Sequence, residues 1–222
     1  TGQRAVILID EYDKPLLQNL HDEEMQNRFR NMLKPFYGVL KTMDRAIRFA
    51  LLTGVTKFGK VSVFSDLNNL DDISMREPYA AICGITETEL RTHFDEDIHT
   101  LASALERTYE EARSLLRKRY DGYHFVAGGP GIYNPFSLLN TFKYMRLSDY
   151  WFETGTPTYL VELLKRTNYD LYDMANTETD ADVLNSIDSA SNNPIPVIYQ
   201  SGYLTIKDYE PEFKIYRLGF PN

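Results

Sequence analysis

Two adjacent carboxylates near the start of the chain are the residues best suited to chemistry. Asp10 and Glu11 directly follow the apolar run AVILI at residues 5–9. One carboxylate can hold a divalent cation through its water shell, and a second can orient or deprotonate a water molecule. The competing interpretation is structural, with Asp10 capping the following turn and Glu11 solvated. The short string alone does not decide between the two interpretations.

The apolar run predicts where these acids lie. Residues 4–9 are too few for a helix and rich in β-branched side chains, so they predict a short strand buried on both faces, as in a parallel sheet. Ligands bind at the carboxyl ends of such strands. A buried strand that ends in Asp-Glu resembles the Walker B pattern of P-loop nucleoside triphosphatases.

A second strand, IRFALLT at residues 47–53, runs into the polar sequence GVT. Residues 23–42 carry apolar side chains at a helical period, and one right-handed crossover through this helix would make the two strands parallel neighbours. Pro35 should kink or divide the helix. In P-loop ATPases of the additional-strand class, the strand after Walker B ends in a polar residue that senses the γ-phosphate. Thr53 or Thr56 is placed for that role, and a plain strand-end cap is the competing interpretation for Thr53.

Farther along, the sequence predicts a weak third strand and then helices. Residues 80–85, AAICGI, form the expected strand, with Cys83 buried in it. Thr86 and Glu89 have capping-box spacing, so a helix should start there and helical character should continue to about Arg119.

The second half of the chain reads as helices followed by a hairpin. Asn134-Pro135 and Thr156-Pro157 are each typical of an N-cap and first helical residue. The end of the chain, from IPVIYQ to FKIYRLGF, predicts a helix or strand that leads into a hairpin.

Composition limits the classes of protein to consider. The 222 residues are 43% apolar, which is enough for a sizeable core, and the net charge of −8 argues against a nucleic-acid-binding surface over the whole chain. Cys83 is the single cysteine, so a reducing, cytoplasmic location is expected. We expect no membrane association, because no apolar run approaches the roughly 18 residues of a membrane span.

Seven segments occur in order along nearly the whole chain: VILIDEYDKPL, LLTGVTKFGKVSVFSDLNNLDDIS, CGITETEL, RYDGYHF, YNPFSLLN, TGTPTYLVELL and QSGYLTIKDYEPEFKIYRLGFPN. Together they resemble the AAA-ATPase-like family of bacterial proteins, which usually carry a PD-(D/E)XK-type nuclease-like domain after this region. The resemblance implies an α/β fold: a partial P-loop NTPase parallel sheet with helices over residues 1–86. A mainly helical lid over residues 87–150 and a winged-helix-like segment over residues 151–222 would follow.

The resemblance also implies an activity for the full-length protein. It should bind and hydrolyse ATP with Mg²⁺, as a regulatory switch coupled to the nuclease-like domain. Asp10 would hold Mg²⁺ through water and contact the nucleotide, and Glu11 would act on the attacking water. Asn68 follows the sensor-like strand and could face the nucleotide or equally lie in a turn. Arg76 lies where related ATPases place an arginine finger, and a surface arginine is the competing interpretation.

One departure from the family pattern matters. The chain contains no Walker A loop, GxxxxGK[ST], since Lys60 in GVTKFGKVS is followed by Val61. We therefore expect residues 1–222 to be the middle piece of a longer protein, with the Walker A segment and the nuclease-like domain as its missing partners. Alone, the piece should bind neither ATP nor Mg²⁺.

The missing strand should also leave the sheet incomplete between residues 47–53 and 80–85. The exposed edge would then be protected by self-association, by a neighbouring chain or by disorder of one strand. Residues 5–9 should still pair in parallel with residues 47–53.

Two other functions stay open: a DNA- or protein-binding module without ATPase activity, and a structural relic that no longer binds nucleotide. The nucleic-acid alternative has weak support, because the basic residues of the predicted hairpin are diluted by acidic ones. The basic residues are Lys207, Lys214 and Arg217, and the acidic ones are Asp208, Glu210 and Glu212.

Overall fold

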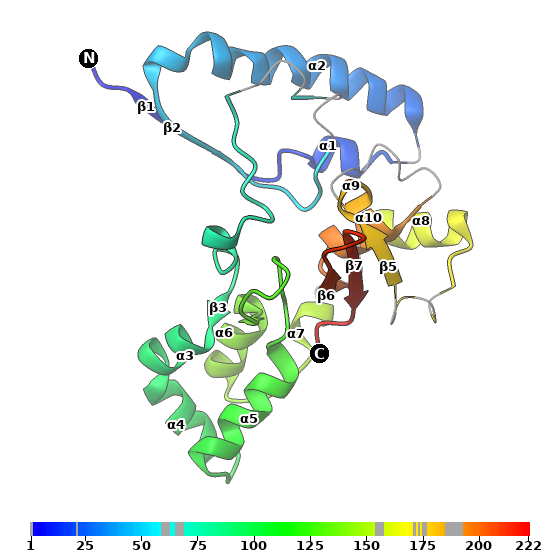
Figure 1. The fold of residues 1–222 in the computed structure, drawn as a ribbon. Coiled ribbons are helices and arrows are strands. Elements are labelled where there is room, and N and C mark those ends of the chain that lie inside the picture. The colour runs from blue at the N-terminus through cyan, green and yellow to red at the C-terminus, as the bar shows by residue number, and fades with distance from the viewer. Residues whose placement is uncertain are drawn as a thin grey trace. The chain divides into compact units, whose positions relative to one another are not determined.

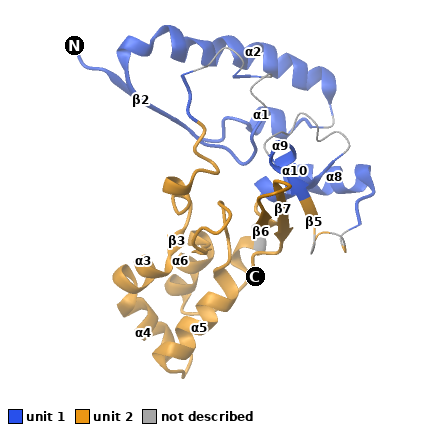
Figure 2. Ribbon diagram, viewed as in Figure 1, with its two compact units in different colours: residues 1–71, 157–171, 179–201 blue, residues 72–156, 172–178, 202–222 orange. Residues whose placement is uncertain are grey.

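A computed structural model describes residues 2–20, 22–58, 63–64, 69–153, 158–170, 172, 174, 177–184 and 193–222. These residues form a mixed α/β fold with small sheets, which confirms the expected class at that level. Two compact units combine segments that are distant in sequence (Figure 2). Unit 1 comprises Thr1–Asp71, Pro157–Leu171 and Thr179–Ser201, and unit 2 comprises Asp72–Thr156, Tyr172–Glu178 and Gly202–Asn222. The division into core, lid and winged-helix-like segments stays a prediction.

Unit 1 begins with the predicted pair of strands. Strand β1 (Ala5–Ile9) pairs in parallel with β2 (Ile47–Leu52), as expected (Figure 1). Between them lie α1 (Lys14–Leu17), α2 (Glu23–Thr42) and the 3-10 turn η1 (Asp44–Ala46). The two strands and the crossover helix are therefore confirmed.

Helix α2 continues through Pro35 without being divided. Pro35 lies on the exposed side of the helix, where the carbonyl that loses its backbone donor can turn to water. Asp22 caps the start of the helix, and its side chain accepts a hydrogen bond from the Met25 backbone N–H.

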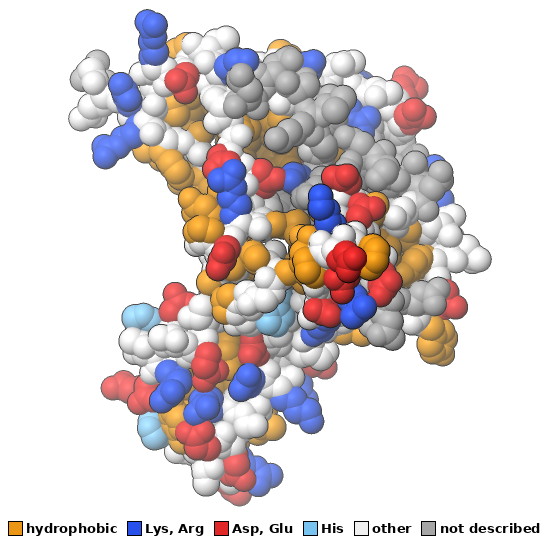
Figure 3. All heavy atoms as spheres, viewed as in Figure 1, with side chains coloured by type: hydrophobic (Ala, Val, Ile, Leu, Met, Phe, Trp, Pro, Cys, Tyr) orange, Lys and Arg blue, Asp and Glu red, His pale blue; other side chains and the backbone are white. Residues whose placement is uncertain are grey.

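The prediction that the first strand is buried on both faces is wrong. Val6 and Leu8 of β1 are 57% and 69% exposed, and Phe49 of β2 is 52% exposed. Figure 3 shows hydrophobic side chains open to solvent along this part of the molecule. Among the described residues no third strand joins β1 and β2, so the ribbon lacks the neighbours that would bury this face.

The predicted third strand at residues 80–85 is also wrong. After the 3-10 turn η2 (Glu77–Tyr79), successive turns use the backbone donors, as when the Ile82 N–H donates to the Tyr79 carbonyl and the Gly84 N–H to the Ala81 carbonyl. Only β3 (Ile85–Thr86) is a strand, and it pairs with β4 (Ile132–Tyr133). Cys83 is consequently exposed and not a core residue.

Helices form most of unit 2 and bury their own core. They are α3 (Glu87–His93), α4 (Asp95–Ala104), α5 (Tyr109–Tyr120), α6 (Pro135–Tyr144) and α7 (Tyr150–Glu153). The predicted capping box of Thr86 and Glu89 is present, and Asn134 caps α6 as expected. The fully buried side chains of this core include Leu90, Ile98, Leu101, Leu116, Tyr133 and Leu138.

The remaining elements lie toward the end of the chain. Helices α8 (Thr158–Thr167), α9 (Ala181–Leu184) and α10 (Ile195–Gln200) precede the hairpin of β6 (Thr205–Glu210) and β7 (Ile215–Gly219). The antiparallel hairpin is confirmed, and β5 (Thr177–Asp180) extends it in the order β5-β7-β6. The Thr156-Pro157 cap lies outside the described residues. In the described part of the chain, no helix is both long enough and apolar enough to cross a membrane.

Candidate functional site

The parallel pairing of β1 and β2 brings their carboxyl ends to the same edge. The Thr53 hydroxyl donates a 2.5 Å hydrogen bond to Asp10 Oδ1. The backbone of Thr53 is fixed as well, because its N–H donates to the Ile9 carbonyl and its carbonyl accepts from the Tyr12 N–H. Two residues predicted for the site, 43 positions apart, are thus in direct contact.

Glu11 sits in a turn with an unusual backbone. Its φ of 51° lies in the left-handed region that residues other than glycine rarely occupy. Its N–H donates to Asp10 Oδ1 at 2.9 Å, and its carboxylate forms a 2.6 Å ion pair with Lys14 Nζ. Both side chains of this pair are more than half exposed, so the pair is worth little in stability and leaves Glu11 accessible to water.

The oxygen atoms at this edge suit a hard cation such as Mg²⁺. Asp10 is exposed, and both of its hydrogen bonds use Oδ1, which leaves Oδ2 without a donor among the described residues. The same described part of the chain holds no group of three or more His, Cys, Asp or Glu residues able to enclose a metal. Mg²⁺ commonly needs only one or two carboxylates, with water and substrate phosphates completing its shell, so the residues present fit that ion.

Asp13 is a buried member of the site that the sequence analysis missed. It is 1% exposed, and its Oδ2 accepts hydrogen bonds from the Thr56 N–H at 2.6 Å and the Thr56 hydroxyl at 2.5 Å. Its Oδ1 faces the Val55 N–H at 3.3 Å. The position just before Lys14-Pro15 indicates a helix cap, but the side chain makes no cap hydrogen bond and binds the loop after β2 instead.

The two candidate sensor threonines have different surroundings. Thr53 is exposed beside Asp10, whereas Thr56 is 3% exposed and its hydroxyl is used by Asp13. Beyond Thr56, the Lys57 N–H donates to Gln200 Oε1 at 2.5 Å, and Gln200 Nε2 donates to the Leu184 carbonyl. Helix α10 therefore holds the far end of the same loop, a contact across 143 positions that no local sequence signal indicates.

The structure does not test the roles of two further predicted residues, Asn68 and Arg76. Asn68 lies outside the described residues. Arg76 is exposed just before η2 and belongs to unit 2, whereas Asp10 belongs to unit 1. Their contacts with a nucleotide stay predictions.

Two hollows in the described surface are not lined by these carboxylates. One, of about 560 Å³, is lined by Gln3, Arg4, Val6 and Arg48, at the amino ends of β1 and β2. We give it less weight than the carboxyl ends, where ligands of parallel sheets bind.

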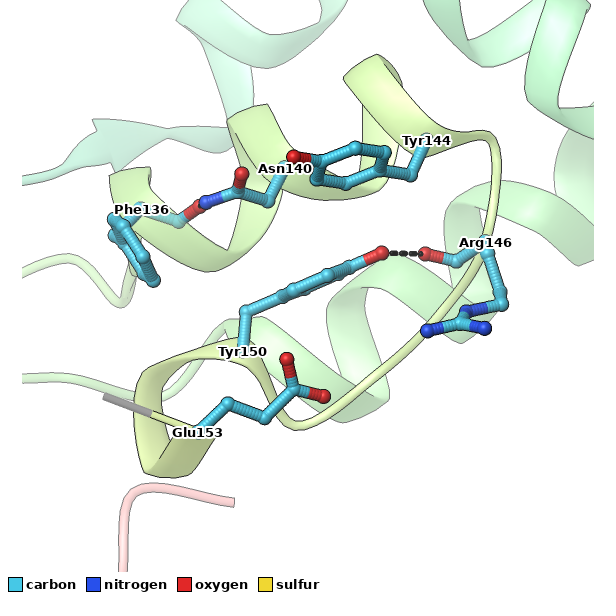
Figure 4. Close-up of a pocket in the computed structure, with 6 residues that line it drawn as sticks. All are labelled: Phe136, Asn140, Tyr144, Arg146, Tyr150 and Glu153. Atoms are coloured by element: carbon cyan, nitrogen blue, oxygen red, sulfur yellow. Dashed lines mark hydrogen bonds between the residues drawn. The ribbon is translucent and has the colours of Figure 1, made fainter. Parts of the chain in front are cut away.

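A second hollow, of about 420 Å³, lies in unit 2 between α6 and α7 (Figure 4). It is lined by Phe136, Asn140, Tyr144, Arg146, Tyr150 and Glu153. The Tyr150 hydroxyl donates to the Arg146 carbonyl, and Glu153 accepts from the Ser148 hydroxyl. The lining carries one charge of each sign beside its aromatic rings, so its chemistry selects no ligand class.

Comparison with known proteins finds a similarity that includes the carboxyl ends of β1 and β2. A family model described as Predicted AAA-ATPase matches residues 1–64. That range contains β1, α2, β2 and the loop after β2, and so includes the Asp10–Thr53 contact and Asp13.

A curated relative extends the similarity along the chain. It is a protein of Azotobacter chroococcum mcd 1 described as an uncharacterized protein in the vnfD 5′ region, and it is 39% identical over 226 residues. The match covers 100% of this chain but 41% of the relative, so the chain spans about two fifths of the relative's length. No solved structure matches the chain.

Proposed function

We propose that the protein containing this chain is an AAA-like P-loop ATPase that binds and hydrolyses ATP with Mg²⁺. We further propose that it acts as a regulatory switch coupled to a C-terminal nuclease-like domain. The observation that carries the proposal is the contact between Asp10 and Thr53, which joins a strand-end carboxylate to a strand-end hydroxyl. The family match to residues 1–64 supports the same assignment.

The proposal gives each residue at the edge a task. Asp10 would hold the metal through water with Oδ2, which has no donor among the described residues. Thr53, which is exposed, would sense the γ-phosphate in preference to the buried Thr56. Glu11 would accept a proton from, or orient, the attacking water once it leaves Lys14. When bound, Mg²⁺ supplies charge neutralisation at the phosphates.

The exposed ribbon supports a further part of the proposal. A two-stranded ribbon with Val6 and Leu8 open to water is not independently stable as a sheet. We propose that a segment outside residues 1–222 adds a strand and the GxxxxGK[ST] phosphate cradle that these residues lack. Self-association through the same edge is the alternative way to cover it.

Substitution of the two acids in the longer natural protein tests the proposal. Glu11→Gln should abolish phosphate release and leave ATP binding intact, because the amide keeps the shape but cannot take a proton. Asp10→Ala should instead weaken the dependence on Mg²⁺ concentration. Steady-state phosphate release and calorimetric ATP binding measure the two effects.

The matched control is Glu24→Gln, which changes an exposed glutamate in the first turn of α2. It should leave both measurements unchanged. Phosphate release by Glu11→Gln at the unsubstituted rate would remove Glu11 from the catalytic role, and an unsubstituted protein that neither binds nor hydrolyses ATP would refute the proposed function.

The binding-module alternative has less support. On the hairpin, Arg217 forms ion pairs with Glu178 and Asp208, each at 3.1 Å. Burial lowers the pKa of Lys207, whose ammonium donates to the Pro221 carbonyl. These cations are already engaged within unit 2, so the hairpin is a poor phosphate-binding face.

A further inference from the structure

Asp13 is a buried carboxylate with no task in the reaction proposed above. The ring of the preceding residue, Tyr12, packs on Phe64 with 5.0 Å between ring centroids, and Phe64 packs on Tyr37 at 5.3 Å. Burial, and then the charge of Asp13, raise the pKa of Tyr37. An ionised carboxylate is expensive to bury unless donors compensate it, so its retention needs a reason.

Among the described residues, the side-chain oxygens of Asp13 accept hydrogen bonds from the 53–56 loop, which follows β2. The donors are the backbone N–H groups of Val55 and Thr56 and the Thr56 hydroxyl. Hydrogen bonds to an ionised acceptor are stronger than neutral ones, so these bonds hold the loop firmly. Asp13 itself belongs to the turn after β1, and it therefore ties together the two turns that carry Asp10 and Thr53.

Gly54 shows how closely the two turns approach. A Cβ atom at this position would lie 2.8 Å from Asp13 Cγ and 2.9 Å from Tyr12 Cε1. A larger residue would push the loop away from Asp13, so the contact requires glycine at position 54.

We infer that Asp13 is a positioning residue, which holds the 53–56 loop so that the Thr53 hydroxyl stays against Asp10. The purpose of this contact rests on the proposed ATPase function. The contact itself does not, because it consists of hydrogen bonds between residues of this chain. Loss of Asp13 should let the loop move, and Thr53 should then miss the position from which it would sense the γ-phosphate.

Two readouts in the longer natural protein test the inference. In Asp13→Asn, amide hydrogen exchange at Val55 or Thr56 should accelerate by about 10-fold or more, because the side-chain NH2 group faces one of the two backbone N–H groups and cannot accept its hydrogen bond. The kcat for ATP hydrolysis should fall by about 10- to 100-fold, the range seen when outer-shell positioning partners are removed, while KM changes less than about 2-fold. Gly54→Ala should reproduce both effects from the opposite side of the contact.

Asp22→Asn is the matched control, since Asp22 is a carboxylate of unit 1 that caps α2 and does not reach the loop. It should leave both kcat and the exchange of Val55 and Thr56 unchanged. The inference is overturned if exchange at Val55 and Thr56 is the same in Asp13→Asn as in the natural protein, or if Asp22→Asn lowers kcat equally. An unsubstituted protein without ATPase activity would refute the proposed function and with it the catalytic purpose of Asp13, while the exchange data would still decide whether Asp13 holds the loop.

Discussion

The β1–β2 ribbon of unit 1 and the helical cluster of unit 2 use apolar residues in opposite ways. In unit 2, apolar side chains from α3, α4, α5 and α6 are fully buried against one another. In the ribbon, comparable side chains such as Val6 and Leu8 remain largely exposed. Amphipathic helices close to each other in sequence can bury one another's faces, whereas a parallel sheet needs further strands and helices on both faces.

The difference bears on the candidate site. The helices of unit 2 are held by a shared core, so no single polar contact decides their arrangement. The site edge depends on a few polar contacts across 42 to 44 positions, among them Thr53 with Asp10 and Asp13 with Thr56. The helical cluster therefore has a buried apolar core of its own, whereas the candidate chemistry lies on a ribbon with an exposed apolar face.

The largest expected effect compares one leucine from each region. Leu101→Ala, in the core of unit 2, should lower the free energy of unfolding by about 3 kcal/mol, because it leaves a cavity. Leu8→Ala, at an exposed position of β1, should change it by less than about 0.5 kcal/mol. Urea denaturation followed by Trp151 fluorescence measures the effect in unit 2, where this single tryptophan lies. Amide hydrogen exchange of β1, measured over the same urea concentrations, gives the stability of the ribbon.

Equal destabilisation by the two leucine substitutions, each in its own region, would contradict the comparison. It would mean that the exposed face of β1 is covered in solution, by a second copy of the chain or another partner. Sedimentation of the natural chain and of Leu8→Ala would then identify self-association.

A smaller effect is expected at the helix caps of unit 2. The Thr108 hydroxyl accepts a hydrogen bond from the Glu111 N–H in a complete capping box. Thr108→Ala should cost about 1 kcal/mol in unfolding free energy, measured by the same fluorescence-detected urea series. Thr92→Ala is the control, because the Thr92 hydroxyl only donates to the Thr88 carbonyl within α3 and should matter by less than about 0.5 kcal/mol. A loss as large in the control would show that the cap is not the cause.

The smallest effect is a dependence on acid. Hydrogen bonds from the backbone and hydroxyl of Thr86 lower the pKa of Glu89 below its ordinary value of 4.5, and those of Thr108 do the same for Glu111. A lowered folded-state pKa stabilises the fold above 4.5, and this contribution is lost as the pH falls through the folded-state value. The urea midpoint of unit 2 should therefore fall less steeply below pH 4.5 in a Glu89→Gln/Glu111→Gln variant than in the natural chain. If the urea midpoint depends on pH equally in the variant and the natural chain, these caps are not the source of the acid sensitivity.

Local signals predicted much of the secondary structure. The apolar runs at residues 5–9 and 47–52, the helical period of α2 and the capping boxes all specify backbone conformation through neighbours within a few positions. The predicted strand at residues 80–85 was wrong, because a short apolar run does not show whether a neighbouring strand lies where it could pair. Pairing of Ile85 with Tyr133 and the turns after Pro78 decided that region.

The sequence by itself determined the types of residue at the site edge and the strand ends on which Asp10 and Thr53 lie. Only the tertiary structure decided that their side chains meet, that Thr56 is turned inward and that Asp13 binds the neighbouring loop. Strand and helix formation depend on residues near one another in the chain, and apolar residues therefore recur along the sequence at the period of a strand or a helix. A buried carboxylate and its donors 42 or 43 positions away leave no such period, because their contact exists only once the parallel ribbon has formed.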